Sequence, residues 1–150
     1  MDELAQILIA RHLSISSVES FTVGSFANQI GSISGISAVY RGSLVSYQTC
    51  IKHTVLGIDQ NIIDTYGVVS QEVARCMAIQ GQKLFDSDIC ISFTGNAGPL
   101  AMENKPVGLI YIGIAYLDSC YTYEYHLDGS RQDIKDKAVM LGIKNILDLL

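Results

Sequence analysis

The stretch "SQEVARCMAIQGQKLFDSDICISFTG", residues 70–95, predicts a helix that is followed at once by a buried strand. Ser70 is placed to cap this helix over residues 70–85. Apolar side chains recur near one helical face at Val73, Cys76, Met77 and Leu84. Residues 87–95 then form a short apolar run that ends in a glycine, which is typical of a strand inside a sheet. A helix leading into a buried strand indicates an α/β arrangement.

The same alternation extends in both directions from this stretch. Toward the N-terminus the pattern predicts helices over residues 2–13, 22–32 and 49–56 and strands over 14–19 and 38–47. Toward the C-terminus it predicts strands over 107–117 and 120–127, joined by a hairpin around Asp118 and Ser119, and a last helix over 131–150. We therefore predict one domain over residues 1–150, a three-layer α/β/α sandwich with a mixed sheet.

The composition excludes several classes of protein. Hydrophobic residues make up 49% of the 150 residues, which argues against disorder, and the formal net charge of −5 without a basic run argues against a nucleic-acid surface. The four cysteines are widely spaced and form no CxxC pair, so we expect no metal site. Two of them, Cys90 and Cys120, lie in apolar runs and are expected to be small core residues.

The sequence also bears on location. The N-terminal stretch Met1-Asp2-Glu3 carries two acidic residues where a secretory signal would be basic, and no apolar run approaches the ~20 residues of a membrane span. We expect a cytoplasmic protein with reduced thiols and no membrane partner.

Three polar segments follow predicted strands: residues 19–22, 47–52 and 94–99. In open α/β sheets, ligands bind at the carboxyl ends of the strands, so these segments are the candidate site. Ser20 has two interpretations, a helix N-cap, which the sequence alone favours, or a nucleophile that needs a base. Lys52 is either a solvated surface lysine or a base whose pKa is lowered by desolvation, and His53 is expected to be a solvated helix residue.

The remaining polar candidates also keep two interpretations. Tyr47 is either a half-buried aromatic residue or a proton relay beside a serine–lysine pair. The loop "TGNAGP", residues 94–99, is either a tight turn or a set of backbone N–H groups for an anion. Arg131 is either a solvated first-turn arginine or a bidentate anion clamp.

Six fragments, in order, resemble the C-terminal domain of the CinA family, the competence/damage-inducible proteins. They are "ESFTVG" (19–24), "GISAVYRGSLVSYQTCIK" (35–52), "YGVVSQEVARCMA" (66–78), "TGNAGP" (94–99), "KPVGLIYIGIA" (105–115) and "GSR" (129–131). The resemblance covers nearly the whole chain. The family includes stand-alone nicotinamide mononucleotide deamidases, and the chain resembles that stand-alone form.

The resemblance implies an amidohydrolase that converts nicotinamide mononucleotide to nicotinate mononucleotide and ammonia. The family's serine, tyrosine and lysine fall on Ser20, Tyr47 and Lys52, which are the expected catalytic residues. The expected substrate-binding residues are Glu19, Thr22, Gly24, Thr94, Gly95, Ala97, Gly98 and Arg131. The implied chemistry needs no metal or other cofactor, and the expected partners are a small nucleotide and further copies of the chain in a homo-oligomer.

The sequence departs from the family pattern at several positions near this site, which are Phe21, Val23, Thr49, Cys50, Asn96, Leu100, Ala101, Met102 and Ser130. Phe21 replaces a cysteine, and Val23 replaces a glycine, where a branched side chain would narrow the pocket if the ligand approaches the backbone there. The departures leave an alternative function open. In that alternative the domain binds a nucleotide without hydrolysing it and regulates a partner.

Overall fold

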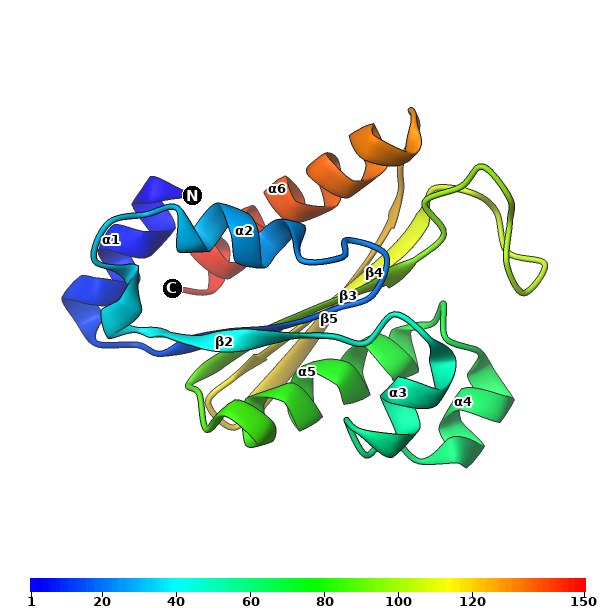
Figure 1. Cartoon of the computed structure of the whole chain (residues 1–150), viewed down its shortest axis with the longest axis horizontal. Helices are drawn as coiled ribbons and strands as arrows, with labels where there is room; N and C mark the ends of the chain where they lie inside the picture. Colours follow the sequence, from blue (N-terminus) through cyan, green and yellow to red (C-terminus); the bar gives the residue numbers. More distant parts are fainter.

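A five-stranded mixed sheet lies between two layers of helices in the computed structural model, which describes residues 1–150 (Figure 1). The strands are β1 (Ile15–Glu19), β2 (Tyr40–Val45), β3 (Ile89–Gly95), β4 (Leu109–Tyr116) and β5 (Ser119–His126). Their order across the sheet is β2-β1-β3-β4-β5. Strand β1 runs parallel to β2 and β3, whereas β3, β4 and β5 pair antiparallel, so the predicted mixed sheet is confirmed.

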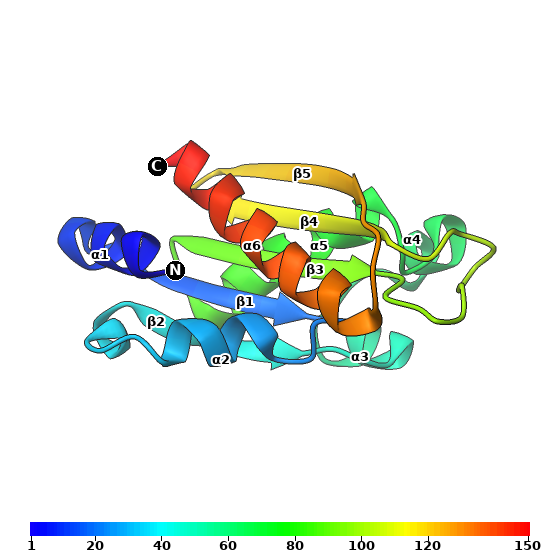
Figure 2. The ribbon, with the colours of Figure 1, turned by 90° about the horizontal axis from the view of Figure 1, so that it is seen from above.

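The helices divide between the two faces of the sheet. One face carries α1 (Asp2–Arg11), α2 (Ser25–Gly31) and α6 (Arg131–Leu149), and the other carries α3 (Thr49–Thr54), α4 (Gln60–Tyr66) and α5 (Gln71–Phe85) (Figure 1). A short 3-10 helix, Ile36–Ala38, precedes β2. The view from above shows α6 lying across the sheet and α2 along its β1–β2 side (Figure 2). The three-layer prediction is therefore confirmed. None of the helices combines the length and apolarity needed to cross a bilayer.

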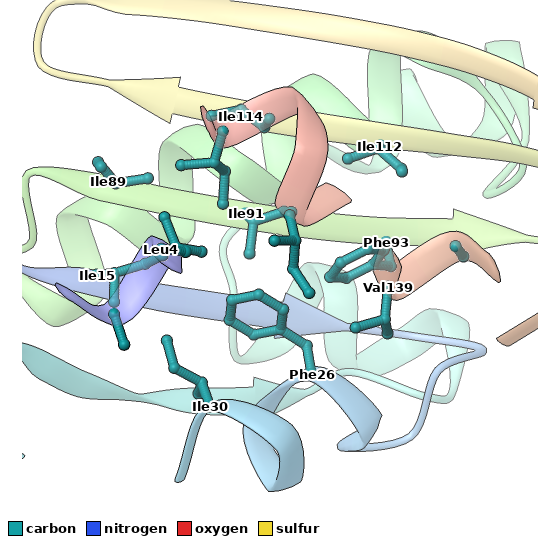
Figure 3. Packing of buried hydrophobic residues seen from close by; sticks show 14 of the residues in the cluster. Leu4, Ile15, Phe26, Ile30, Ile89, Ile91, Phe93, Ile112, Ile114 and Val139 are labelled. Carbon is teal, nitrogen blue, oxygen red and sulfur yellow. The ribbon is translucent and has the colours of Figure 1, made fainter. Parts of the chain in front are cut away.

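The core consists of one apolar cluster on each face of the sheet. All five residues of β1 are buried, as are six of the seven in β3, so these two strands are covered on both sides. Under α2 and α6, Phe26 and Phe93 pack with their ring centroids 5.9 Å apart, beside Ile91 and Val139 (Figure 3). Because β1 and β3 are parallel, their carboxyl ends lie at the same edge of the sheet. The candidate site lies at this edge, and the burial of both strands holds it in place.

Four sequence predictions about local structure were wrong. Leu84 is 53% exposed, because α5 packs through Val73, Ala74, Met77, Ala78 and Gly81 instead. Cys120 is only partly buried, since β5 is an edge strand. The β4–β5 turn is Leu117–Asp118, one residue earlier than predicted.

The fourth concerns α2, which begins at Ser25 and not at Thr22, because Val23 and Gly24 adopt left-handed backbone conformations with φ of 50° and 82°. One helix, α4, was not predicted at all. Asp59 caps it by accepting a hydrogen bond from the Asn61 backbone N–H, at 2.8 Å.

Candidate active site

A pocket opens where β1, β2 and β3 end, at the edge from which the loop between β3 and β4 projects (Figure 2). It encloses about 560 Å³, part of it open to solvent. Eight of the residues predicted from the sequence line it: Ser20, Tyr47, Lys52, Thr94, Gly95, Ala97, Gly98 and Arg131. Four segments that are far apart in the sequence thus meet at one cavity.

Lys52 lies at the bottom of this arrangement and is only 1% exposed. Helix α3 directs its side chain under the end of β1, where Nζ lies 3.0 Å from Ser20 Oγ and donates to the Ser46 carbonyl oxygen at 2.6 Å. No carboxylate forms an ion pair with it. Burial lowers the pKa of Lys52 from its ordinary 10.5 to about 8, because desolvation disfavours the ammonium form. The interpretation of Lys52 as a solvated surface lysine is wrong.

Ser20 does not cap a helix. The N-cap of α2 is Gly24, which makes no side-chain cap, and the first-turn N–H groups of Phe26 and Ala27 donate to the buried Glu19 carboxylate at 3.2 and 2.9 Å. The cap interpretation of Ser20 is therefore wrong. Its hydroxyl faces the pocket with Lys52 as its side-chain partner.

Three residues that the sequence analysis assigned to substrate binding lie outside the pocket lining. Glu19 is fully buried beneath α2, the Thr22 hydroxyl is buried without a hydrogen-bond partner, and Gly24 supports the turn into α2. The structure places these three behind Ser20, where they shape the turn between β1 and α2.

Arg131 spans the mouth of the pocket from the start of α6. One guanidinium nitrogen donates to the Gly98 carbonyl oxygen at 2.6 Å, and another donates to the Tyr47 hydroxyl at 3.2 Å. Tyr47 lines the cavity and is 55% exposed. The two side chains link the loop after β2 with the loop after β3.

The turn after β1 and the loop after β3 carry backbone donors at the cavity. The Thr94 hydroxyl is not a free donor, since it donates to the Val68 carbonyl oxygen at 2.6 Å. The N–H groups of Phe21, Ala97 and Gly98, all in lining residues, donate to no protein atom. They are candidates for holding an oxyanion or a phosphate oxygen.

The departures from the family pattern are not all in the cavity. Thr49 and Met102 belong to the cavity wall. Phe21, Asn96 and Leu100 line it, but Val23 points to solvent and does not narrow the pocket. Ser130 is the N-cap of α6 and forms a capping box with Asp133, which fixes the start of the helix that carries Arg131. The Asn96 amide nitrogen donates to the Met102 and Lys105 carbonyl oxygens at 3.2 and 3.0 Å and so ties the following loop together.

The sequence analysis missed part of the wall. Val68 and Val69 also line the pocket, and the Ser46 carbonyl oxygen orients Lys52. The valines follow Gly67 in the stretch "YGVVS", but this segment forms no strand, so nothing in its periodicity marked it as a pocket wall.

The charges at the pocket are opposite in sign to the charge of the chain. Lys52 and Arg131 line the cavity and no Asp or Glu does, although the chain carries a net charge of −5. His53 lies outside and pairs with the Ile58 carbonyl oxygen. No group of three His, Cys, Asp or Glu side chains is placed to hold a metal ion. The site therefore combines a hydroxyl, a buried amine and an environment suited to an anion.

Comparison with known proteins identifies the family. The family model described as the CinA C-terminal domain matches residues 1–150. The chain belongs to the CinA family. A protein of Lactiplantibacillus plantarum that carries the name competence-damage inducible protein is 43% identical over 144 residues, which is 95% of this chain and 33% of the relative. This chain spans about a third of the length of the curated CinA relatives it matches.

Solved CinA structures have the same architecture. A CinA superfamily protein of Escherichia coli matches with a TM-score of 0.97 and 28% identity, over 99% of this chain and 87% of that chain. A competence/damage inducible protein of Agrobacterium tumefaciens matches with a TM-score of 0.91 and 28% identity, over 99% and 94% of the two chains.

Proposed function

We propose that this CinA domain is an amidohydrolase that deamidates nicotinamide mononucleotide to nicotinate mononucleotide and ammonia. The observation that carries the proposal is the contact of Ser20 Oγ with Lys52 Nζ at 3.0 Å, in a pocket where Lys52 has no carboxylate partner. A serine hydroxyl is a weak nucleophile until a base removes its proton. A lysine whose pKa lies near 8 can act as that base at neutral pH.

The first half of the reaction forms an ester on Ser20. Neutral Lys52 takes the hydroxyl proton, and Oγ attacks the carboxamide carbon of the substrate. The N–H groups of Phe21, Ala97 or Gly98 stabilise the oxyanion, since they have no protein acceptor. The Lys52 ammonium then returns its proton to the departing amide nitrogen, which leaves as ammonia.

The second half releases the acid. Water attacks the ester carbon while Lys52 removes a proton from it, and the same proton returns to Ser20 Oγ as the C–O bond breaks. The Ser46 carbonyl oxygen holds Nζ in place through both halves, because it accepts one N–H bond whether the amine is charged or neutral.

The choice of substrate rests on charge and on the family resemblance. A pocket with two cations and no lining carboxylate favours a ligand that carries a phosphate. Arg131 is the candidate phosphate contact, because its guanidinium is exposed at the mouth and only two of its bonds are to the protein. A flat ring could pack against the apolar side chains of the pocket, which include Phe21, Val69 and Met102.

Ammonia release from nicotinamide mononucleotide tests this function. We expect turnover by the parent protein and a loss of at least ~10³-fold in Ser20→Ala and Lys52→Met, because each change removes a group that acts in the bond-breaking step. Ser32→Ala and Lys83→Met are matched controls on exposed positions and are expected to keep parental turnover. Absence of ammonia release by the parent protein at high enzyme concentration would contradict the proposal. Binding without turnover would instead support the non-hydrolytic alternative.

A further inference from the structure

The Tyr47 hydroxyl stands apart from the serine–lysine pair at the bottom of the pocket. The buried Lys52 side chain bonds only to Ser20 and Ser46, at 3.0 and 2.6 Å. Tyr47 is 55% exposed, and the one hydrogen bond of its hydroxyl joins it to Arg131 at 3.2 Å. No hydrogen bond therefore connects this hydroxyl to the groups that act in the bond-breaking step.

The hydrogen bond between Arg131 and Tyr47 has only one possible direction. A guanidinium carries N–H donors and no acceptor, so Arg131 donates and the tyrosine oxygen accepts. The proton of the Tyr47 hydroxyl must then be donated elsewhere, and no protein atom accepts it. The side chain thus holds a hydroxyl donor at the pocket mouth that a ligand can use.

The guanidinium beside this hydroxyl is held in a fixed orientation. Its other hydrogen bond is to the Gly98 carbonyl oxygen at 2.6 Å, and the capping box of Ser130 and Asp133 fixes the start of the helix that carries it. These two bonds leave the other N–H donors of Arg131 free. We call the Tyr47 hydroxyl and the Arg131 guanidinium the mouth pair.

The mouth pair suits a phosphate monoester. Such a group carries several strong acceptor oxygens, so it can accept from the guanidinium and from the neighbouring hydroxyl at the same time. A carboxylate can be held by the guanidinium alone through two parallel bonds and leaves the hydroxyl without a role. No Asp or Glu side chain lines the pocket to repel an anion.

We propose that Tyr47 is a substrate-binding residue that donates its hydroxyl proton to the phosphate of the nucleotide, beside Arg131, and is not a proton relay for Ser20. The phosphate then stays at the mouth while the carboxamide reaches Ser20 at the bottom, which matches the two ends of a nucleoside monophosphate. The proposed function supplies the identity of the nucleotide in this inference, but recognition of the phosphate can be measured without turnover.

The test compares nicotinamide mononucleotide with nicotinamide riboside, which lacks the phosphate. In Tyr47→Phe we expect the ratio of the two kcat/KM values to fall about tenfold, because one hydrogen bond to a charged group is lost. The loss is expected in KM for the nucleotide and not in kcat. A proton relay predicts a lower kcat for both compounds and an unchanged ratio, and that result would overturn the proposal.

A second comparison separates direct contact from the orientation of Arg131. In the Arg131→Ala background, Tyr47→Phe is expected to raise KM for the nucleotide further, since the hydroxyl itself contacts the phosphate. No further effect would show that Tyr47 only orients the guanidinium, and would contradict the proposal. Tyr121→Phe removes the hydroxyl of an exposed tyrosine on β5, outside the pocket, and is expected to keep the parental ratio.

Binding without turnover completes the test. Calorimetry on Ser20→Ala gives the Kd of the nucleotide, of the riboside and of inorganic phosphate. In that background Tyr47→Phe is expected to raise the Kd of the nucleotide and of phosphate about tenfold and to change that of the riboside much less. Failure of the parent protein to release ammonia would contradict the proposed function alone. Equal Kd values with and without the Tyr47 hydroxyl, or binding of neither the nucleotide nor phosphate, would overturn this inference.

Discussion

At the scale of single residues, Lys52 has an electrostatic cost that the fold does not offset with an ion pair. It is 1% exposed and bonded only to Ser20 and Ser46, two uncharged partners. Between pH 8 and 10.5 the folded protein has released this proton while the unfolded chain still holds it. The unfolded state then binds more protons, so stability contributed by this residue increases as the pH rises through that window.

Lys52→Met tests this cost. At pH 7 we expect the variant to unfold with a free energy about 1–3 kcal/mol higher than the parent protein, because a buried ammonium is replaced by an apolar side chain of similar length. Between pH 8 and 10.5 the difference should shrink, since the parent loses its buried charge there. Urea unfolding at a series of pH values measures both. A difference that is constant with pH would contradict the lowered pKa.

Val23 is strained for a different reason. Its φ of 50° lies in the left-handed region, which β-branched residues rarely adopt, and its side chain is 48% exposed. We expect Val23→Gly to raise the free energy of unfolding by about 0.5–1 kcal/mol, because relief of the left-handed strain exceeds the added entropy of glycine in the unfolded chain. Thermal unfolding measures this change, and a lower melting temperature would show that Val23 makes a contact that outweighs its strain.

At the scale of elements, close packing of α5 on the sheet depends on Gly81. A Cβ there would lie 2.4 Å from Val18 Cγ2 and 2.6 Å from Cys90 Sγ, in the apolar cluster between α5 and the sheet. Helix α5 also carries the segment that precedes it, including the valines of the pocket wall. The packing of α5 on the sheet therefore positions Val68 and Val69 in the pocket wall.

Gly81→Ala should lower the free energy of unfolding by about 1–3 kcal/mol. Overpacking against β1 and β3 outweighs the gain of up to about 1 kcal/mol from helix propensity. Gly31→Ala is the matched control, since a Cβ at Gly31 meets nothing within 4 Å and no loss is expected. Denaturant unfolding compares the two, and equal effects of both substitutions would contradict the packing explanation.

The elements that the sequence predicted well are those with a strong local signal. Apolar runs identify β3 and β4, and Ser70 marks the start of α5, where its hydroxyl accepts from the Val73 N–H. The turn after β1 was harder to predict, because it depends on Val23 and Gly24 in left-handed conformations and on Glu19 reaching seven residues ahead to α2. A carboxylate buried under a helix cannot be told from an exposed one by periodicity.

The same limit applies to the candidate site. The positions of Ser20, Tyr47 and Lys52 after strands predicted that they meet, and they line one pocket. The burial of Lys52 and the attachment of Glu103 to the backbone of Val68 could not be predicted, since both depend on contacts between segments more than 30 residues apart. The sequence was enough to name the candidate residues, but the burial that lowers the pKa of Lys52 depends on tertiary contacts.

At the scale of the whole molecule, the pocket joins both helical layers to the sheet. Its lining comes from the ends of β1 and β3 and from α3 and α6, which lie on opposite faces of the sheet. A ligand that binds there only in the folded state must stabilise the whole domain. In Ser20→Ala, which we expect not to turn the nucleotide over, nicotinamide mononucleotide at about 100 times its Kd should add about 2.7 kcal/mol to the free energy of unfolding.

Thermal unfolding of Ser20→Ala with and without the nucleotide measures this stabilisation. Arg131→Ala in the same background is expected to reduce it, because the phosphate loses its cationic contact at the pocket mouth. Equal stabilisation with and without Arg131 would place the phosphate elsewhere.

The most direct test of the account is product analysis when nicotinamide mononucleotide is turned over in the presence of hydroxylamine. If Ser20 forms an ester, hydroxylamine competes with water for it, and the parent protein is predicted to yield ammonia together with both the nicotinate product and the corresponding hydroxamate. Ser20→Ala is predicted to yield none of the three above the rate without enzyme. Ammonia release by Ser20→Ala at the parental rate, or turnover without any hydroxamate, would contradict attack by Ser20.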